Sequence, residues 1–290
     1  MARTNPSLWQ GFLVERGFGK DLAAVWANLV RPNVHLVPGP VVGADATPIG
    51  ASKLGGNPDL PIGTPWPLRS GQQPLTFLAQ LDLSELSKCG SGLPLPDDGL
   101  LLFFYDAETQ PWGFDPADAS GTQVLHVGSG TALQRAHDPE GRTLNVRTLR
   151  LAPAECLPSW EPFQDKASEA GFDTHRVSRG IDKLSDEDLV HMTYGGHAVG
   201  GWPALIQSPM ELRCQLASNG IDVGHPEGYE HPRAAELAPG AVDWRLLLQL
   251  DNDNDLDWVW GDEGRLYFWC REQDLTARRF DRCWTVLQCF

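Results

Sequence analysis

The residues best suited to chemistry are six carboxylates that lie close together in the C-terminal half. They are Asp251, Asp253, Asp255, Asp257, Asp262 and Glu263, and no Lys or Arg stands between them. Oxygen ligands at alternate positions suit a hard cation such as calcium. With Asp251 as position one of an EF-hand-like loop, Asp262 stands at position twelve, but Leu256 takes position six, where the loop needs glycine. The sequence therefore offers Asp251, Asp253, Asp255 and Asp262 as a candidate site for a divalent cation.

The alternative for this segment is a solvated acidic turn that joins two strands. Trp258-Val259-Trp260 has the composition of a strand, and position twelve holds a short Asp where calcium loops carry a Glu. The sequence favours this alternative. We therefore expect no cofactor and keep a divalent cation as a hypothesis.

A second set of polar residues comes from the word Gln-Leu-Asp, which twice ends an apolar run. It places Gln80 with Asp82 and Gln249 with Asp251. Side chains two residues apart on a strand point to the same side. If the two runs are related by a pseudo-two-fold axis, these four residues and Asp262 form a polar cluster that lines a cleft. The sequence favours the alternative, in which the side chains satisfy backbone groups of adjoining loops.

An enzyme built on this cluster would use Asp82, Asp251 or Asp262 as acid or base. The chain holds no G-x-S-x-G nucleophile elbow, no H-E-x-x-H zinc motif and no dinucleotide-binding G-x-G-x-x-G. Lys53 beside Gly55 lacks the residue order of a phosphate-binding loop. We therefore lean against an enzyme and leave its activity open.

Four words recur in the same order, which indicates an internal duplication. Residues 55–58, 77–82, 99–104 and 124–126 match residues 200–203, 246–251, 264–269 and 286–288. The interval from Gly56 to Gln80 is 24 residues, and the interval from Gly201 to Gln249 is 48. The second copy therefore carries an insertion, which we place around residues 208–240.

The elements that carry these words are mainly strands. Residues 7–30 show a helical spacing of apolar residues, with a break at Gly17 and Gly19, and residues 32–74 are rich enough in Gly and Pro to predict an ordered loop. Strands are expected at residues 75–81, 100–105, 123–127, 144–151, 203–207, 211–217, 244–250, 258–260, 265–270 and 284–288, and short helices near 185 and 272–280. The predicted fold class is α+β, β-rich and mainly antiparallel, with two related halves and a helical N-terminal segment.

Several words together are specific enough to suggest a family. They are Ser-Lys-Leu-Gly-Gly-x-Pro-x-Leu-Pro at 52–61, Phe-Leu-Ala-Gln-Leu-Asp at 77–82, Phe-Phe-Tyr-Asp at 103–106, Trp-Gly-Phe-Asp-Pro at 112–116 and Trp-Gly-Asp-x-Gly-Arg-Leu-Tyr-Phe at 260–268. They resemble the YwqG-like family of uncharacterised bacterial proteins, from about residue 50 to the C-terminus. The resemblance implies a β-rich α+β globule and at most a binding role, of the kind discussed around bacterial toxin and immunity systems. It implies no catalytic residue, and the acidic residues after Asp251 depart from it.

The start of the resemblance divides the chain. We expect an N-terminal helical segment at residues 1–49 and a YwqG-like domain at 50–290. The halves of that domain are expected at about 50–150 and 195–290, with a connecting segment at 151–194.

Composition predicts the kind of partner. The formal net charge of −15 disfavours nucleic acid and anionic membranes, because both need clustered Lys and Arg. A cationic ligand, a metal ion or a basic protein patch is the natural electrostatic partner. Among these we favour a basic protein partner, and so a protein-interaction module, immunity-like in the sense of the resemblance. The oligomeric state is not indicated.

The compartment is predicted from what the chain contains. No apolar stretch approaches the roughly 20 residues that cross a bilayer, and the first six residues have no hydrophobic signal region, so we expect a cytoplasmic protein. Six cysteines without a C-x-x-C pair are expected to be free thiols.

Overall fold

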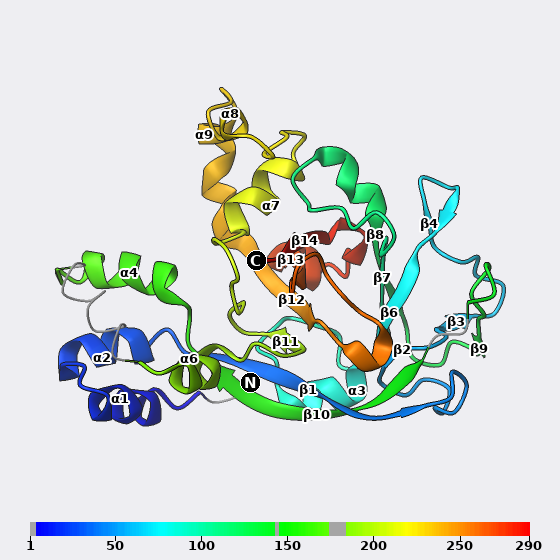
Figure 1. Ribbon diagram of the computed structural model, residues 1–290, viewed down its shortest axis with the longest axis horizontal. Helices are drawn as coiled ribbons and strands as arrows, with labels where there is room; N and C mark the ends of the chain where they lie inside the picture. The colour runs from blue at the N-terminus through cyan, green and yellow to red at the C-terminus, as the bar shows by residue number, and fades with distance from the viewer. Residues whose placement is uncertain (1–3, 143–144, 174–183) are drawn as a thin grey trace.

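One ten-stranded sheet, nearly closed into a barrel, forms the centre of the computed structural model, which describes residues 4–142, 145–173 and 184–290 (Figure 1). In sheet order its strands are β14 (Trp284–Gln288), β13 (Arg265–Arg271), β12 (Trp244–Asp251), β11 (Ala198–Gly200), β1 (Arg31–Val42), β10 (Val146–Cys156), β2 (Lys53–Gly55), β6 (Thr76–Asp82), β7 (Leu100–Tyr105) and β8 (Thr122–Val127). Neighbouring strands are antiparallel. The predicted α+β, mainly antiparallel fold is confirmed.

The strand order is symmetrical about the central pair β1–β10. Strands β2, β6, β7 and β8 follow β10 on one side, and β11, β12, β13 and β14 follow β1 on the other. Lys53 pairs with Gln80 as Ala198 pairs with Gln249. The pairing of β6 with β7 and that of β12 with β13 each shift at the same place, three residues before the glutamine. The two halves are therefore copies of one four-stranded unit.

Equivalent positions follow from the strand register. Leu100 lies opposite Val127, and Arg265 lies opposite Gln288, so the last pair of words is offset by one residue from the match made on the sequence. The Gly-Gly pairs do coincide. Gly55 and Gly200 have φ of 66° and 71°, and a Cβ at either position would lie 2.4 Å or 2.6 Å from a backbone oxygen. Only glycine fits such a left-handed, close-packed turn.

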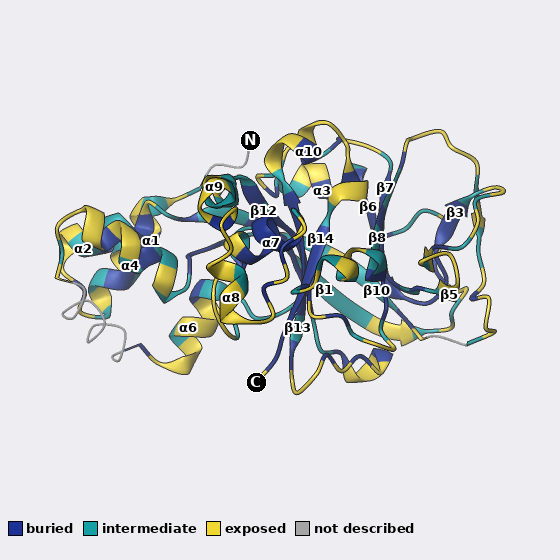
Figure 2. Cartoon of the chain, turned by 90° about the horizontal axis from the view of Figure 1, so that it is seen from above, coloured by how far each residue is buried: buried dark blue, intermediate teal, exposed yellow. Residues whose placement is uncertain are grey.

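Alternate residues of each half face two different cores. Leu101 and Phe103 of β7 meet Leu266 and Phe268 of β13 in the core between the halves. The residues next to them along each strand point to the outer face of the sheet. On that face Leu60 packs on the first half, and a separate cluster of buried residues packs on the second half. Figure 2 shows these strands buried inside a more exposed shell. Because successive side chains point to opposite faces, each strand contributes residues to both cores.

A helical part lies at one end of the sheet (Figure 1). It consists of α1 (Pro6–Glu15), α2 (Lys20–Ala27), α4 (Trp160–Glu169) and α6 (Asp186–Thr193). Asn5 caps α1, and the break predicted between the first two helices falls at Gly17, with φ of 88°, and Gly19, the N-cap of α2. Trp26 of α2 stacks on Phe163 of α4 with ring centroids 4.1 Å apart. No helix among the described residues has the length and apolar character needed to cross a bilayer.

Strand β1 corrects the ordered loop expected at residues 32–74. Its prolines made the segment resemble a loop in the sequence. In the structure, Pro38 and Pro40 lie beyond the residues that pair with β11 and at the register shift opposite β10. A missing N–H is tolerated at such a place. The sheet therefore begins before residue 50, within the segment that the sequence assigned to helices.

The insertion in the second half forms a helix where a strand was expected at 211–217, and the strand expected at 203–207 is irregular backbone. It contains α7 (Glu211–Ala217), α8 (Pro226–Tyr229), α9 (Ala234–Leu237) and the 3-10 helix η2 (Ala238–Asp243). Met210, Cys214 and Ala217 recur at helical spacing and pack on the outer face of the second half, although Leu212, Cys214 and Leu216 alternate like a strand.

Short elements complete the chain. They are α3 (Leu83–Cys89), α10 (Glu272–Thr276), the 3-10 helices η1 (Pro116–Gly121), η3 (Asn254–Leu256) and η4 (Phe280–Arg282), and the strand pairs β3 (Asp59–Pro61) with β9 (Leu133–Arg135) and β4 (Leu68–Arg69) with β5 (Gln73–Pro74). The strand expected at 258–260 is reduced to one bridge, from Trp258 to Asp253.

Candidate functional site

Gln80 lies buried on β6 and holds the chain on both sides of the first Gly-Gly pair. Its Oε1 accepts a hydrogen bond from Asp59 N at 2.9 Å, and its Nε2 donates to Ala51 O at 3.0 Å. A third bond runs from Nε2 to Asp59 Oδ2 at 2.8 Å. The amide is thus used within its own half.

Gln249 on β12 repeats this arrangement in the second half. Its Oε1 accepts from Ala204 N at 3.1 Å, and its Nε2 donates to Gly196 O at 2.7 Å. These partners occupy the positions that Asp59 and Ala51 occupy in the first half, because the strand register places Ala198 where Lys53 stands. Both glutamines have the structural role that the sequence favoured.

The aspartates of the two words also hold equivalent positions, but their carboxylates differ in use. Asp82 N donates to Ser52 Oγ at 2.9 Å, and Asp251 N donates to His197 Nδ1 at 3.0 Å, from the equivalent position. The Asp82 carboxylate caps α3, while Asp251 lies 3.2 Å from a guanidinium nitrogen of Arg265. Asp82 and Asp251 therefore serve different local contacts.

The predicted cluster of Gln80, Asp82, Gln249, Asp251 and Asp262 is not joined by contacts. Within the parts of the chain that the structure describes, no hydrogen bond or ion pair links the first two to the last three. The surface hollow beside Asp82 is lined by neither Asp251 nor Asp262, which is exposed. An acid and base shared between the halves stays a hypothesis.

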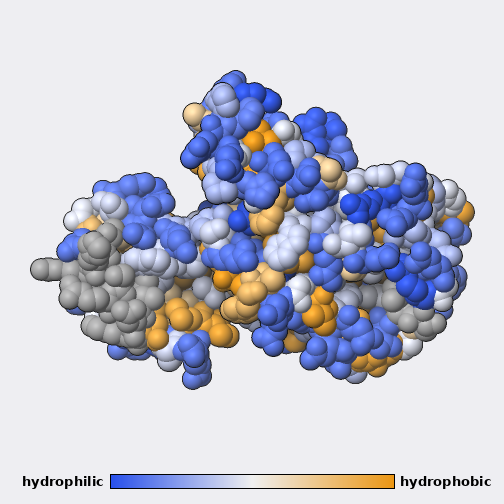
Figure 3. Space-filling model, turned by 45° about the horizontal axis from the view of Figure 1, so that its top comes forward, coloured by the Kyte–Doolittle hydropathy of each residue, from blue (hydrophilic) through white to orange (hydrophobic). Residues whose placement is uncertain are grey.

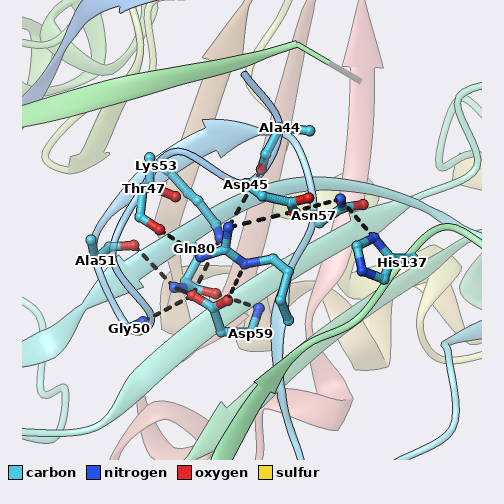
Figure 4. A network of polar contacts seen from close by, with 11 residues as sticks. Ala44, Asp45, Thr47, Gly50, Ala51, Lys53, Asn57, Asp59, Gln80 and His137 are labelled. Carbon is cyan, nitrogen blue, oxygen red and sulfur yellow. Dashed lines mark hydrogen bonds and ion pairs between the residues drawn. The ribbon is translucent and has the colours of Figure 1, made fainter. Parts of the chain in front are cut away.

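The first half differs from the second in a buried charge cluster, drawn in Figure 4. The side chains of Lys53 and Asp59 are fully buried, with Lys53 Nζ 3.3 Å from Asp59 Oδ2. Arg135 of β9 pairs with the other oxygen of Asp59. The second half has Ala198 and Ala204 at the positions of Lys53 and Asp59.

Burial and charge set the ionisation of this cluster. Burial, with a smaller contribution from Arg135, lowers the pKa of Lys53 to about 8, and Asp59 opposes this change. Burial favours the neutral acid of Asp59, but hydrogen bonds from Arg135, Gln80 and the Gly50 N–H outweigh it and lower the pKa of that carboxyl. The Lys53 ammonium group is buried and bonded within this network, so it is not available to bind an anion.

The acidic turn is partly neutralised by an arginine from the central strand β10. Asp253 is buried and receives two bonds from Arg147 of β10, at 3.0 Å and 3.1 Å, with His197 Nε2 3.6 Å away. Asp255, which is 60% exposed, lies 3.1 Å from the same guanidinium. Burial would raise the pKa of Asp253, but the bonds from His197 and Arg147 lower it.

The four predicted metal ligands are therefore distributed over different contacts. Two of them, Asp253 and Asp255, share Arg147, while Asp251 contacts Arg265 and Asp262 faces solvent. In the described ranges, no group of three or more His, Cys, Asp or Glu residues is placed to hold a metal ion. The metal hypothesis stays a prediction.

Sequence reasoning missed Arg135 and Arg147, because their partners lie 76 and 106 residues away along the chain. One signal was present. Aligning the repeated words places Lys53 and Asp59 opposite two alanines, and a charged pair in place of small residues marks a position where the copies differ.

The comparison with known protein families found a match over most of the chain. A family model described as "Domain of unknown function (DUF1963)" matches residues 52–289. The chain belongs to this family. The DUF1963 match begins at β2 and spans both halves, so the N-terminal helices and the central strand β1 lie outside it. No curated protein matches the chain.

The DUF1963 family confirms the expectation of an uncharacterised domain family, while the narrower YwqG-like grouping stays a resemblance. The family's description names no reaction, ligand or partner. A function for this DUF1963 domain therefore has to be argued from its own surface.

Proposed function

We propose that this protein is a protein-interaction module whose acidic surface binds a basic partner, in the cytoplasm of a bacterium and in an immunity-like role. A net charge of −15 favours approach of a positively charged partner and raises its association rate. The charge alone does not select a surface, so the proposal depends on where exposed acids and apolar side chains occur together.

They occur together in the region that we call the acidic face, defined by Asp257, Val259, Asp262, Glu263 and Phe290. The three acids are exposed, and unlike Asp253 they have no ion-pair partner among the described residues. Val259 is 53% exposed and Phe290 is 81% exposed. Exposed apolar groups rimmed by unpaired charge are typical of a binding surface.

Backbone contacts fix the acidic face in one arrangement. Gln110 donates to Val259 O and accepts from Gly261 N, both at 2.9 Å, and Phe290 N donates to Asp262 O at 3.0 Å. Trp112, which is 39% exposed, accepts from Leu287 N at 3.3 Å and extends the apolar part beside β14. This pre-ordered set of exposed acids and apolar groups is the observation that carries the proposal.

The test is affinity capture with the full chain at low and at moderate salt. A variant that carries Asp257→Asn, Asp262→Asn and Glu263→Gln removes the charge of the acidic face. The control carries Glu227→Gln, Glu230→Gln and Glu236→Gln, which removes as many exposed charges from α8, its C-cap and α9.

We expect a basic partner that wild type and control retain and the acidic-face variant loses, with weaker capture at moderate salt because exposed charges are screened. Recovery of no partner at either salt concentration, or equal capture by all three proteins, would overturn the proposal.

A further inference from the structure

A hollow of about 560 Å³ lies between the N-terminal helix α1 and the sheet, far from the acidic face along the chain. Its walls come from four separate stretches of the chain, which are α1 with Trp9 and Phe12, β1 with His35, β10 with Glu155 and α6 with His191. Figure 1 shows these elements together at the helical end. Figure 3 shows apolar side chains exposed at the same end of an otherwise mainly hydrophilic face.

Three rings form one side of the hollow. The ring centroids of Trp9 and Phe12 are 5.6 Å apart, and His191 lies 5.4 Å from the first and 5.2 Å from the second. Aromatic faces carry negative charge density and attract ammonium or guanidinium groups. The group already shows this behaviour, because the Arg16 guanidinium lies 3.5 Å from the Phe12 centroid while Asp188 neutralises its charge.

A fixed carboxylate forms another side. Glu155 accepts from Trp9 Nε1 at 2.9 Å and from Asn5 N at 2.8 Å, so each oxygen is held in place by one donor. Both donors are neutral, and Glu155 has no ion-pair partner in the part of the chain that the structure describes. Glu15 adds a second carboxylate, and no Lys or Arg is among the described lining residues. The charge of the hollow is therefore negative and uncompensated.

The remaining wall does not repel a cation. His35 stacks on Tyr194 with centroids 3.4 Å apart, and its buried Nε2 has no hydrogen-bond partner among the described residues. Burial lowers the pKa of His35 to about 4, so the imidazole is neutral near pH 7.

We propose that this hollow is a binding site for an organic cation, a guanidinium or ammonium group on an apolar body, held by the Trp9–Phe12–His191 rings and by Glu155. The site goes beyond the proposed interaction with a basic partner and does not depend on it, since it uses none of the acidic-face residues. Such a cation reaches the hollow either as a free small molecule or as a side chain of another protein.

Calorimetry on the full chain with a matched pair of probes tests the site. N-acetyl-arginine amide carries the guanidinium, and N-acetyl-citrulline amide is its neutral counterpart of nearly the same shape. We expect the arginine probe to bind about tenfold more tightly. No binding of either probe at millimolar concentration, or equal binding of both, would overturn the proposal.

Two variants assign the binding to this hollow. Glu155→Gln removes the charge and keeps one acceptor oxygen, for either Trp9 Nε1 or Asn5 N. Phe12→Leu removes a ring while keeping the position apolar. Each variant is expected to bind the arginine probe about tenfold more weakly. The control Glu161→Gln on α4 is expected to bind it as tightly as wild type. Loss of discrimination must occur with an unchanged unfolding temperature; full binding by both variants would contradict the assignment.

A further comparison identifies the source of the cation. Free arginine offers its own ammonium and carboxylate, while the capped probe offers only the side chain and amides. Tighter binding of free arginine indicates a small-molecule site, and tighter binding of the capped probe indicates a side chain of another protein.

Discussion

Phe103 and Phe268 hold the same position in the two halves and meet edge to face in the core between them, with ring centroids 5.2 Å apart. Contact between equivalent residues is what a pseudo-two-fold axis produces. The two halves are therefore packed on each other through their inner faces rather than separated by an open cleft.

This contact predicts energetic coupling between the halves. Phe103→Leu and Phe268→Leu should each lower the free energy of unfolding by about 1–3 kcal/mol. The double variant should depart from the sum by about 0.5–1.5 kcal/mol, because the edge-to-face pair is lost only once. Urea unfolding measures all three, and Phe103→Leu combined with Phe163→Leu of the helical part is the control. Simple additivity of the Phe103–Phe268 pair would contradict the contact.

The two buried glutamines should contribute similarly to stability, because they hold equivalent loops. Gln80→Leu and Gln249→Leu each orphan a buried N–H and a buried C=O, and should each cost about 2–4 kcal/mol of unfolding free energy. Gln273→Leu on the exposed face of α10 should change it by less than about 0.5 kcal/mol. A cost at Gln249 no larger than that at Gln273 would show that the repeated bonds do not stabilise the fold.

Lys53 predicts an unusual pH dependence. Its pKa is about 8 in the folded protein and 10.5 in an ordinary environment. Between these values the unfolded chain keeps a proton that the folded protein has lost, so stability rises with pH in this window, by up to about 3 kcal/mol. Lys53→Met should remove that rise. Parallel unfolding curves at pH 7 and pH 10 measure it; an equal rise in the variant would assign the effect to other groups.

The acidic turn should be stabilised mainly by one of its acids. Asp253→Asn breaks a buried pair with Arg147 and should cost about 2–4 kcal/mol, whereas Asp255→Asn at the exposed contact with the same guanidinium should cost less than about 1 kcal/mol. Since the pKa of Asp253 is lowered in the folded protein, its contribution is present at neutral pH and is lost as the pH falls through that pKa. Equal costs at pH 7 would contradict this division.

The same variants test the metal hypothesis. Because Arg147 occupies Asp253 and Asp255, we expect calcium, magnesium, manganese and zinc to leave the unfolding temperature of chelator-treated protein unchanged. A cation that binds only the folded state, present at a concentration of 100 times its dissociation constant, raises the free energy of unfolding by about 2.7 kcal/mol. Thermal unfolding detects a change of this size readily. A rise with one cation that Asp253→Asn abolishes would instead make the turn a metal site.

The repeated words predicted the symmetry of the sheet because they mark positions with backbone requirements. Gly55 and Gly200 stand where only glycine fits, and Gln80 and Gln249 satisfy the flanking loops. Such needs leave a recognisable local pattern. Strand β1 left none that could be read, because its prolines are typical of loops, although Pro38 and Pro40 lie outside the pairing with β11 and at the register shift opposite β10.

Contacts between residues far apart in the chain could not be predicted from the sequence. Arg135 lies on β9, which pairs with β3, and Arg147 lies on β10, which pairs with β1 and β2. The hollow beside Trp9 forms only where four separate stretches meet. The carboxylates of Asp82 and Asp251 share a position in the repeat yet have different partners, because the residues around them have diverged.

The most direct test of the acidic face is carboxylate footprinting of the protein alone and with a captured basic partner. Labelling of Asp257, Asp262 and Glu263 should fall on binding, while Glu227, Glu230 and Glu236 should be labelled equally in both states. Unchanged labelling of the first three residues, or protection of the second three instead, would contradict the proposed surface.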